Sequence, residues 1–178
     1  MQVCCVVSTL SNILDVFIVI AIANLEINQN PITISVSTAR DIMEVNFFGV
    51  IQTTVTLLPL IRKSMSGGTI LNVTSIMGSN AFQANLHTTS SRLSAFSAYN
   101  SSKAALNSYT IALSHELKAE GIKVNAVTPG LTSTKLSTYV GKTARAGAEV
   151  LLPWALLEKD GPTGTCLRIS HEFFQVLD

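Results

Sequence analysis

Tyr99 and Lys103 have the side-chain types and the spacing to do acid–base chemistry. The run Tyr99–Lys103 reads Tyr-Asn-Ser-Ser-Lys and continues into the helix-favouring Ala104–Leu106. Residues four apart share one helix face, so we expect the phenol and the ammonium to point the same way, one turn apart. An isolated phenol titrates near pH ~10, and a nearby cation lowers that pKa towards neutrality. The pair predicts a proton donor and acceptor; the alternative is an amphipathic helix with a half-buried tyrosine and a solvated lysine.

The elements on either side of this helix indicate how it is positioned. An apolar strand at 69–74 ends at the hydroxyl residue Ser75, and a second strand at 122–128 ends at Pro129-Gly130. A strand, a helix and a strand separated by Gly and Pro form a βαβ unit, which implies a parallel sheet. Ligands of such sheets bind beyond the carboxyl ends of the strands. We therefore expect Ser75, Tyr99 and Pro129-Gly130 to gather at one edge.

The rest of the chain predicts further elements of an α/β fold. A buried strand covers 15–21, and a polar loop follows at 24–37. A capping box at Thr38–Asp41 predicts the start of a long helix over 38–63, with a kink at Pro59. A helix near 142–158 and a last strand after Gly164 complete the pattern.

Five motifs, in this order, resemble the short-chain dehydrogenase/reductase family. They are Asn46 within Val45–Gly49, the strand end Asn72–Ser75 with Gly78, Tyr99-x-x-x-Lys103, Val124–Gly130 with Thr134, and the tail Lys159–Gly164. The resemblance implies an α/β fold with a doubly wound parallel sheet, a Rossmann-like three-layer sandwich that here lacks its first βαβ units. Residues 1–178 would form a single partial dinucleotide-binding and catalytic domain.

The resemblance also implies a role for each matched residue. Tyr99 would be the general acid in reduction and the base in oxidation, and Lys103 would lower its pKa and bind the nicotinamide ribose. Ser75 would stabilise charge on the carbonyl oxygen, and Asn46 would support a water chain from Lys103 to solvent. Besides Tyr99 and Lys103, the residues lining the nicotinamide would be Pro129, Gly130, Leu131 and Thr134.

The function implied by the resemblance is oxidoreduction. A hydride would pass between NAD or NADP and a small carbonyl or alcohol substrate, and the cofactor would supply the hydride. The long helix at 38–63 and the Tyr99 helix resemble the family's dimer-forming pair, so a homo-oligomer is expected.

Three departures from the family pattern predict weak dinucleotide binding by this chain. The earliest glycine is Gly49, so no glycine-rich phosphate turn precedes the strand at 15–21. Val19–Ile22 stands where the family has Asn-Asn-Ala-Gly. Ser75 and Tyr99 are 24 positions apart, against about a dozen in the family, which predicts a surface insertion around 83–94.

Unless Val3–Val7 folds back over it, the strand at 15–21 would be an exposed apolar edge that self-associates.

Two alternatives belong to other functional classes. A truncated, non-catalytic relative could carry the same motifs and serve as an interaction module, or be an inactive fragment. A sugar-nucleotide epimerase or dehydratase shares Tyr-x-x-x-Lys, but Pro129-Gly130 with Thr134 disfavours it.

Composition and charge exclude several other functions. A net charge of +1 without a basic stripe argues against nucleic-acid binding. The three His share no ligand spacing, so no metal site is expected. Three Cys, an odd number, favour free thiols in a reducing, cytoplasmic compartment. The apolar run at 16–23 is too short to span a bilayer and no basic residue precedes it, so neither a membrane segment nor a signal peptide is expected.

Overall fold

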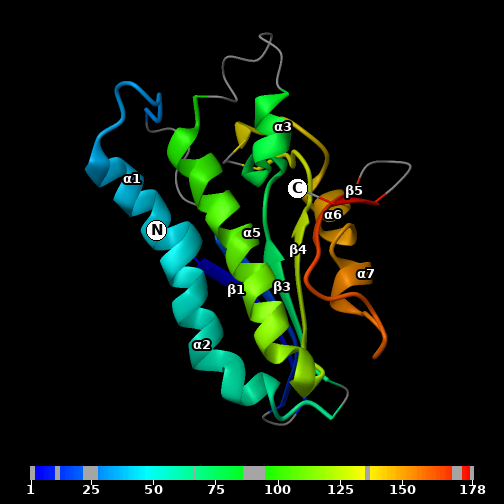
Figure 1. The fold of residues 1–178 in the computed structure, drawn as a ribbon. Helices are drawn as coiled ribbons and strands as arrows, with labels where there is room; N and C mark the ends of the chain where they lie inside the picture. The colour runs from blue at the N-terminus through cyan, green and yellow to red at the C-terminus, as the bar shows by residue number, and fades with distance from the viewer. Residues whose placement is uncertain are drawn as a thin grey trace.

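A single mixed sheet with helices on both faces forms the framework of the protein (Figure 1). The structure is a computed structural model that describes residues 3–10, 13–21, 28–65, 67–85, 95–134, 137–169 and 174–176. The strands lie side by side in chain order: β1 (Val3–Leu10), β2 (Ile13–Ala21), β3 (Thr69–Val73), β4 (Lys123–Thr128), β5 (Cys166–Ile169) and β6 (Phe174–Val176). β2 to β5 are parallel, and β1 and β6 run antiparallel at the two edges. The predicted doubly wound parallel sheet is confirmed, with two antiparallel edges that were not predicted.

The helices form the outer layers of the sandwich. One face is covered by α1 (Val36–Met43), the π-helical turn η1 (Glu44–Phe48), α2 (Gly49–Ile61) and α5 (Ser97–Leu117), which continues into η3 (Lys118–Glu120). The opposite face is covered by α6 (Ala144–Glu149) and α7 (Leu152–Ala155), as Figure 1 shows. The turn η2 (Ile76–Gly78) and the short helix α3 (Asn80–Ala84) follow β3 at the carboxyl edge.

The sheet separates two apolar cores, and successive residues of its central strands point alternately into one core and the other. Ile70 of β3 and Val124 of β4 pack in the first core with Leu106 of α5. Leu71 of β3 packs in the second core with Trp154 of α7. Because successive side chains of a strand point to opposite faces, a strand covered on both faces is buried along its whole length. The polar residues in these strands are buried with partners: the Asn72 Nδ2 donates to the Thr110 hydroxyl at 2.9 Å, and the Asn125 Nδ2 donates to the Pro162 carbonyl at 2.9 Å.

The amino-terminal segment covers the edge of β2. β1 pairs antiparallel with β2 from Val3 opposite Ala21 to Leu10 opposite Ile13. An antiparallel neighbour needs only a short connection, so the adjacent segment of the chain can satisfy the backbone groups of β2. The exception stated for Val3–Val7 is therefore met: this segment pairs with β2, so β2 has no unpaired edge on this side, and β1 forms the outer strand of the sheet.

The long helix begins and is interrupted at other residues than predicted. Ser35, not Thr38, caps it, because the Ser35 hydroxyl accepts the Thr38 N–H at 3.0 Å. The helix α2 contains Pro59 and continues to Ile61, and the helical stretch is widened at η1, where the Gly49 N–H bonds the Glu44 carbonyl five residues back. Insertions of this kind are frequent at functional sites, and this one contains Asn46.

The carboxyl-terminal elements differ from the prediction in detail. The helix expected at 142–158 is two short helices, and Pro153 lies in the first turn of the second. The strand expected after Gly164 is β5, and β6 was not predicted. Most of the insertion expected at 83–94 falls outside the described residues.

The helical stretch Val36–Ile61 has the length and apolar composition of a membrane span. In the fold it is a covering layer of the sandwich, since its inward residues Ile42, Val50 and Ile61 are at most 1% exposed in the first core. Packing against the sheet therefore accounts for these inward residues of the stretch.

Candidate active site

The carboxyl ends of β3 and β4 bring the predicted site residues to one edge of the sheet. Ser75 follows the end of β3, and Pro129 follows the end of β4. The Thr74 N–H donates to the Val127 carbonyl at 3.0 Å, which holds the two strand ends together. The first turn of α5, with Tyr99, lies beside the turn after β3.

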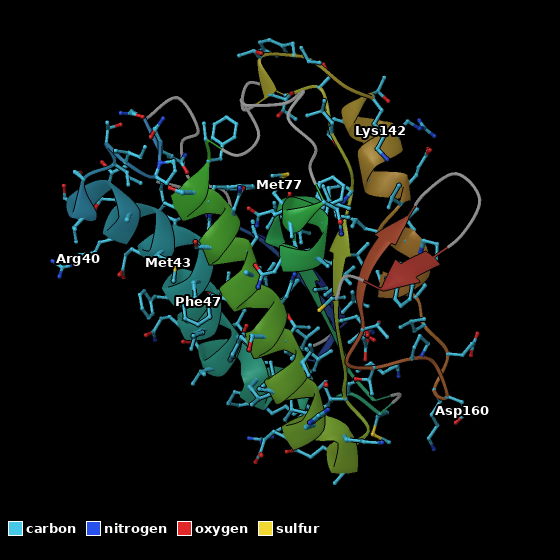
Figure 2. All side chains as sticks on the ribbon, turned by 45° about the horizontal axis from the view of Figure 1, so that its top comes forward. Arg40, Met43, Phe47, Met77, Lys142 and Asp160 are labelled. Atoms are coloured by element: carbon cyan, nitrogen blue, oxygen red, sulfur yellow. The ribbon has the colours of Figure 1, made fainter. Side chains whose placement is uncertain are left out.

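Ser75 and Tyr99 lie near each other at this edge of the sheet. The Ser75 Oγ accepts the Met77 N–H at 3.2 Å as the cap of η2, and the same hydroxyl lies near enough to the Tyr99 phenol to lower its pKa. Figure 2 shows Met77 marking this turn next to α5. Because the backbone amide occupies a Ser75 acceptor position, the Ser75 O–H remains available as a donor. The Ser75 hydroxyl is therefore near the Tyr99 phenol, and the longer spacing between the two residues does not separate them.

Lys103 is buried between the end of β3 and the Tyr99 ring. Its side chain is 2% exposed, and its Nζ donates to the Val73 carbonyl at 3.0 Å. The same Nζ lies 5.8 Å from the centroid of the Tyr99 ring. Burial penalises the charged form and lowers the pKa of Lys103 from 10.5 to about 7. The expected helical pairing of Tyr99 with Lys103 is therefore present in the structure.

The direction of the Tyr99 pKa shift differs from the prediction. Burial raises the pKa of Tyr99, and the nearby Ser75 hydroxyl offsets only part of that increase. Lys103 with a pKa of about 7 carries only part of its positive charge at neutral pH. Desolvation of the phenol is the largest effect, so the pKa of Tyr99 in this chain by itself lies above its ordinary value and not, as predicted, below it.

Asn46 is linked to the Tyr99 helix by hydrogen bonds through Ser102, a residue that the sequence did not single out. Asn46 is fully buried, and its Nδ2 donates to the Ser102 Oγ at 3.0 Å. The Ser102 hydroxyl donates in turn to the Tyr99 carbonyl at 2.7 Å. Asn46 therefore supports the backbone of Tyr99, and its role in a water chain stays a prediction. No signal singled out Ser102, because a small polar residue inside a helix is ordinary.

A close approach of two backbones fixes the turn that carries Ser75. An added Cβ at Gly78 would lie 2.8 Å from the carbonyl carbon of Lys103 and 2.9 Å from its oxygen. Only glycine allows η2 to rest directly on α5 at this distance. The Asn107 Oδ1 also accepts the Thr74 hydroxyl at 2.6 Å. Together these contacts hold the turn after β3 against the helix that carries Tyr99 and Lys103.

The four residues predicted to line the nicotinamide follow β4 at the same edge. Gly130 adopts a left-handed φ of 76°, so a tight turn follows Pro129. Leu131 is 63% exposed, and its carbonyl accepts the Lys142 N–H at 3.1 Å; Figure 2 labels Lys142 above α6. The Thr134 N–H donates to the Ser137 hydroxyl at 3.0 Å. Contact of these residues with a nicotinamide stays a prediction.

Other potentially reactive features lie elsewhere or are inert. Among the described residues, no group of three or more His, Cys, Asp or Glu could hold a metal ion. Burial raises the pKa of the Cys166 thiol to about 11, which keeps it protonated. An open cavity of about 410 Å³ is lined by Asp15, Thr69 and Glu158, among others. Thr69 begins β3, so this cavity lies at the edge of the sheet opposite Ser75.

Known proteins share both the sequence and the fold. Residues 5–145 match the family model for short chain dehydrogenase. The 17-beta-hydroxysteroid dehydrogenase type 6 of Bos taurus is 36% identical over 107 residues, which cover 60% of this chain and 29% of that protein. Salutaridine reductase of Papaver somniferum is 31% identical over 159 residues, which cover 71% of this chain and 50% of that protein.

Solved structures support the same assignment. The structure of salutaridine reductase from Papaver somniferum matches with a TM-score of 0.58 over 72% of this chain and 54% of that one. The carbonyl reductase Sniffer of D. melanogaster, at 22% identity, shares the fold with a TM-score of 0.68 over 84% of this chain and 60% of that one. The chain spans half or less of the length of the two curated relatives. With the family model matching most of its residues, the chain belongs to the short-chain dehydrogenase family.

Proposed function

We propose that this protein is an oxidoreductase that transfers a hydride between a nicotinamide cofactor and a small carbonyl or alcohol substrate. The observation that carries the proposal is the convergence of three groups: the Ser75 hydroxyl acts on the Tyr99 phenol, and the Lys103 Nζ lies 5.8 Å from the centroid of the same ring. A hydroxyl, a phenol and an ammonium converging at the carboxyl edge of a parallel sheet supply the donors that a carbonyl reduction needs. Membership of the short-chain dehydrogenase family supports the same chemistry.

The roles of the residues follow from the charge that develops on the substrate oxygen. When bound, a reduced nicotinamide supplies the hydride that the carbonyl carbon accepts. The Ser75 O–H donates a hydrogen bond to the carbonyl oxygen as negative charge grows on it. The Tyr99 phenol gives that oxygen its proton, which completes the alcohol and leaves a phenolate. Lys103, next to the ring, stabilises the phenolate by its positive charge; in oxidation the phenolate takes the alcohol proton instead.

The residues fit the nicotinamide half of a cofactor, and this fit predicts how binding divides between its halves. The family resemblance assigns the predicted cofactor residues to the nicotinamide and its ribose: Tyr99, Lys103, Pro129, Gly130, Leu131 and Thr134. We therefore expect reduced nicotinamide mononucleotide, which lacks the adenosine half, to bind within about tenfold of NADH and NADPH. Calorimetric titration of the chain with the three compounds measures this, and the NADH and NADPH arms also test cofactor preference.

Two other results of the titration would change the interpretation. Binding of NADH or NADPH that is tight, saturable and far stronger than binding of the mononucleotide would show that this chain reads the adenosine half as well. If none of the three compounds binds, the non-catalytic alternative becomes the better description of the chain.

We also propose that the chain forms homo-oligomers through the outer face of α1, α2 and α5. Large apolar side chains are exposed on this face: Val36 (67%), Phe48 (50%), Val55 (59%) and Ile111 (40%). Burying such a surface between copies removes apolar area from water. We expect light scattering to give a mass above that of a monomer, and Val55→Lys to lower it. As a control, Leu156→Lys replaces a leucine that is 70% exposed and lies outside this face, so it should leave the mass unchanged. An unmodified chain that is monomeric would contradict the proposal.

A further inference from the structure

Gln29 lies in the loop before α1 and is 2% exposed, although it is a polar residue far in sequence from the site. It packs against the first turn of α5, the turn that carries Tyr99. That helix has no cap of its own, because Phe96 at the N-cap position supplies no side-chain hydrogen bond. The first N–H groups of a helix have no partner within the helix, so another part of the fold must satisfy them.

Gln29 satisfies two of these groups with two different atoms. Its main-chain carbonyl accepts the Ser97 N–H at 3.3 Å and the Ser97 hydroxyl at 2.6 Å. Its side-chain Oε1 accepts the Tyr99 N–H at 2.9 Å. The first bonds depend only on the backbone of Gln29, whereas the bond to Tyr99 depends on its side chain. A substitution at position 29 can therefore remove the second contact and leave the first.

We propose that Gln29 is a positioning residue for Tyr99, which fixes the backbone of the residue whose phenol reaches Ser75. The Tyr99 backbone is then held on two sides: its N–H by Gln29 and its carbonyl by Ser102. A phenol that must meet both Ser75 and a substrate oxygen at hydrogen-bond distance tolerates little movement of its backbone. The consequence for proton transfer rests on the proposed function; the positioning itself does not.

Two substitutions distinguish the effect of losing the acceptor oxygen from the effect of changing the side chain. Gln29→Met keeps the length of the side chain and removes the acceptor, so the Tyr99 N–H loses its partner. Gln29→Glu keeps an acceptor oxygen in either protonation state. It also loses no described hydrogen bond, because the Nε2 of Gln29 has no hydrogen-bond partner among the described residues.

Amide hydrogen exchange on the isotope-labelled chain tests the contact directly. In the unmodified chain the Tyr99 amide should be protected. Gln29→Met should accelerate its exchange at least about tenfold, since a partnered first-turn amide becomes unpartnered. Gln29→Glu should leave the rate close to that of the unmodified chain. The amide of Thr110, in the middle of α5, reports whether each variant keeps its fold.

The titration of the Tyr99 phenol gives a second readout that a general loss of stability would not produce. It is measured as the absorbance difference between each protein and its Tyr99→Phe counterpart. Because burial raises the pKa of Tyr99, a loosened first turn hydrates the ring. We therefore expect Gln29→Met to lower this pKa towards its ordinary value of ~10. Gln29→Glu should not lower it.

The possible outcomes decide the proposal one way or the other. Faster Tyr99 exchange and a lower phenol pKa in Gln29→Met, with neither change in Gln29→Glu, support it. Any of three results overturns it: a Tyr99 amide unprotected in the unmodified chain, unchanged exchange or phenol pKa in Gln29→Met, or equal acceleration in both variants. If Gln29→Met does not fold, the protection of the Tyr99 amide in the unmodified chain still tests the proposal. None of the measurements needs cofactor or turnover, so a failure of the proposed function would leave the result for Gln29 intact.

Discussion

Replacing Tyr99 with Phe should reduce hydride transfer by roughly 10³-fold, the range that loss of a general acid–base group produces. The substitution removes one oxygen atom and leaves the ring between Lys103 and Ser75. Without the phenol proton, the oxygen of the reduced carbonyl has no positioned acid, and the Ser75 hydroxyl can only donate a hydrogen bond to it. The rate is measured from the absorbance of the reduced nicotinamide, with a panel of small carbonyl compounds.

A second tyrosine on the same helix provides the matched control. Tyr109 is half-buried in α5, with its ring edge-on to Phe47 at 6.3 Å between centroids. Tyr109→Phe makes the same chemical change away from Ser75, so its rate should stay within about twofold of that of the unmodified chain. Equal rates for Tyr99→Phe and Tyr109→Phe would remove Tyr99 from the chemistry.

The unfolding free energy should increase with pH between about 7 and 10, because of Lys103. The pKa of this lysine is about 7 in the folded chain, against 10.5 for an unperturbed lysine. Between these two values the unfolded chain binds more protons than the folded chain, so stability rises with pH. Below the folded pKa the full penalty of burying the charge is present. One group of this kind contributes roughly 1.4 kcal/mol per pH unit, or about 2–3 kcal/mol between pH 7 and 9.

Lys103→Met isolates this contribution, because methionine has a similar length and no titrating group. Urea unfolding at several pH values should give a smaller pH slope for Lys103→Met than for the unmodified chain. The difference between the two proteins should be largest below pH ~7. Lys63→Met, at an exposed lysine after α2, should keep the slope of the unmodified chain. Parallel slopes for Lys103→Met and the unmodified chain would show that the burial of Lys103 does not govern the pH dependence.

The central elements of the fold and the residues of the site could be predicted from local sequence. Segments rich in apolar residues predicted β2, β3 and β4, although buried polar residues such as Asn72 and Asn125 interrupt β3 and β4. Gly121, with a left-handed φ of 72°, ends the helical segment, as a glycine directly after a helix commonly does. The four-residue spacing of Tyr99 and Lys103 and the position of Ser75 after β3 were enough to predict that the three side chains meet. These signals are local because helix periodicity and the direction of parallel strands follow from backbone geometry alone.

Tertiary structure decided the features that depend on contacts between distant segments. The pairing of β1 with β2 and the widening of the helix at Asn46 have no local signature. The pKa of Tyr99 rises rather than falls, because desolvation depends on the whole shell around the phenol and not on the lysine one turn away. The support of the Tyr99 backbone by Gln29 and Ser102 could not be predicted from the sequence either. Spacing places the reactive groups on one helix face, and long-range packing sets their protonation and holds them in place.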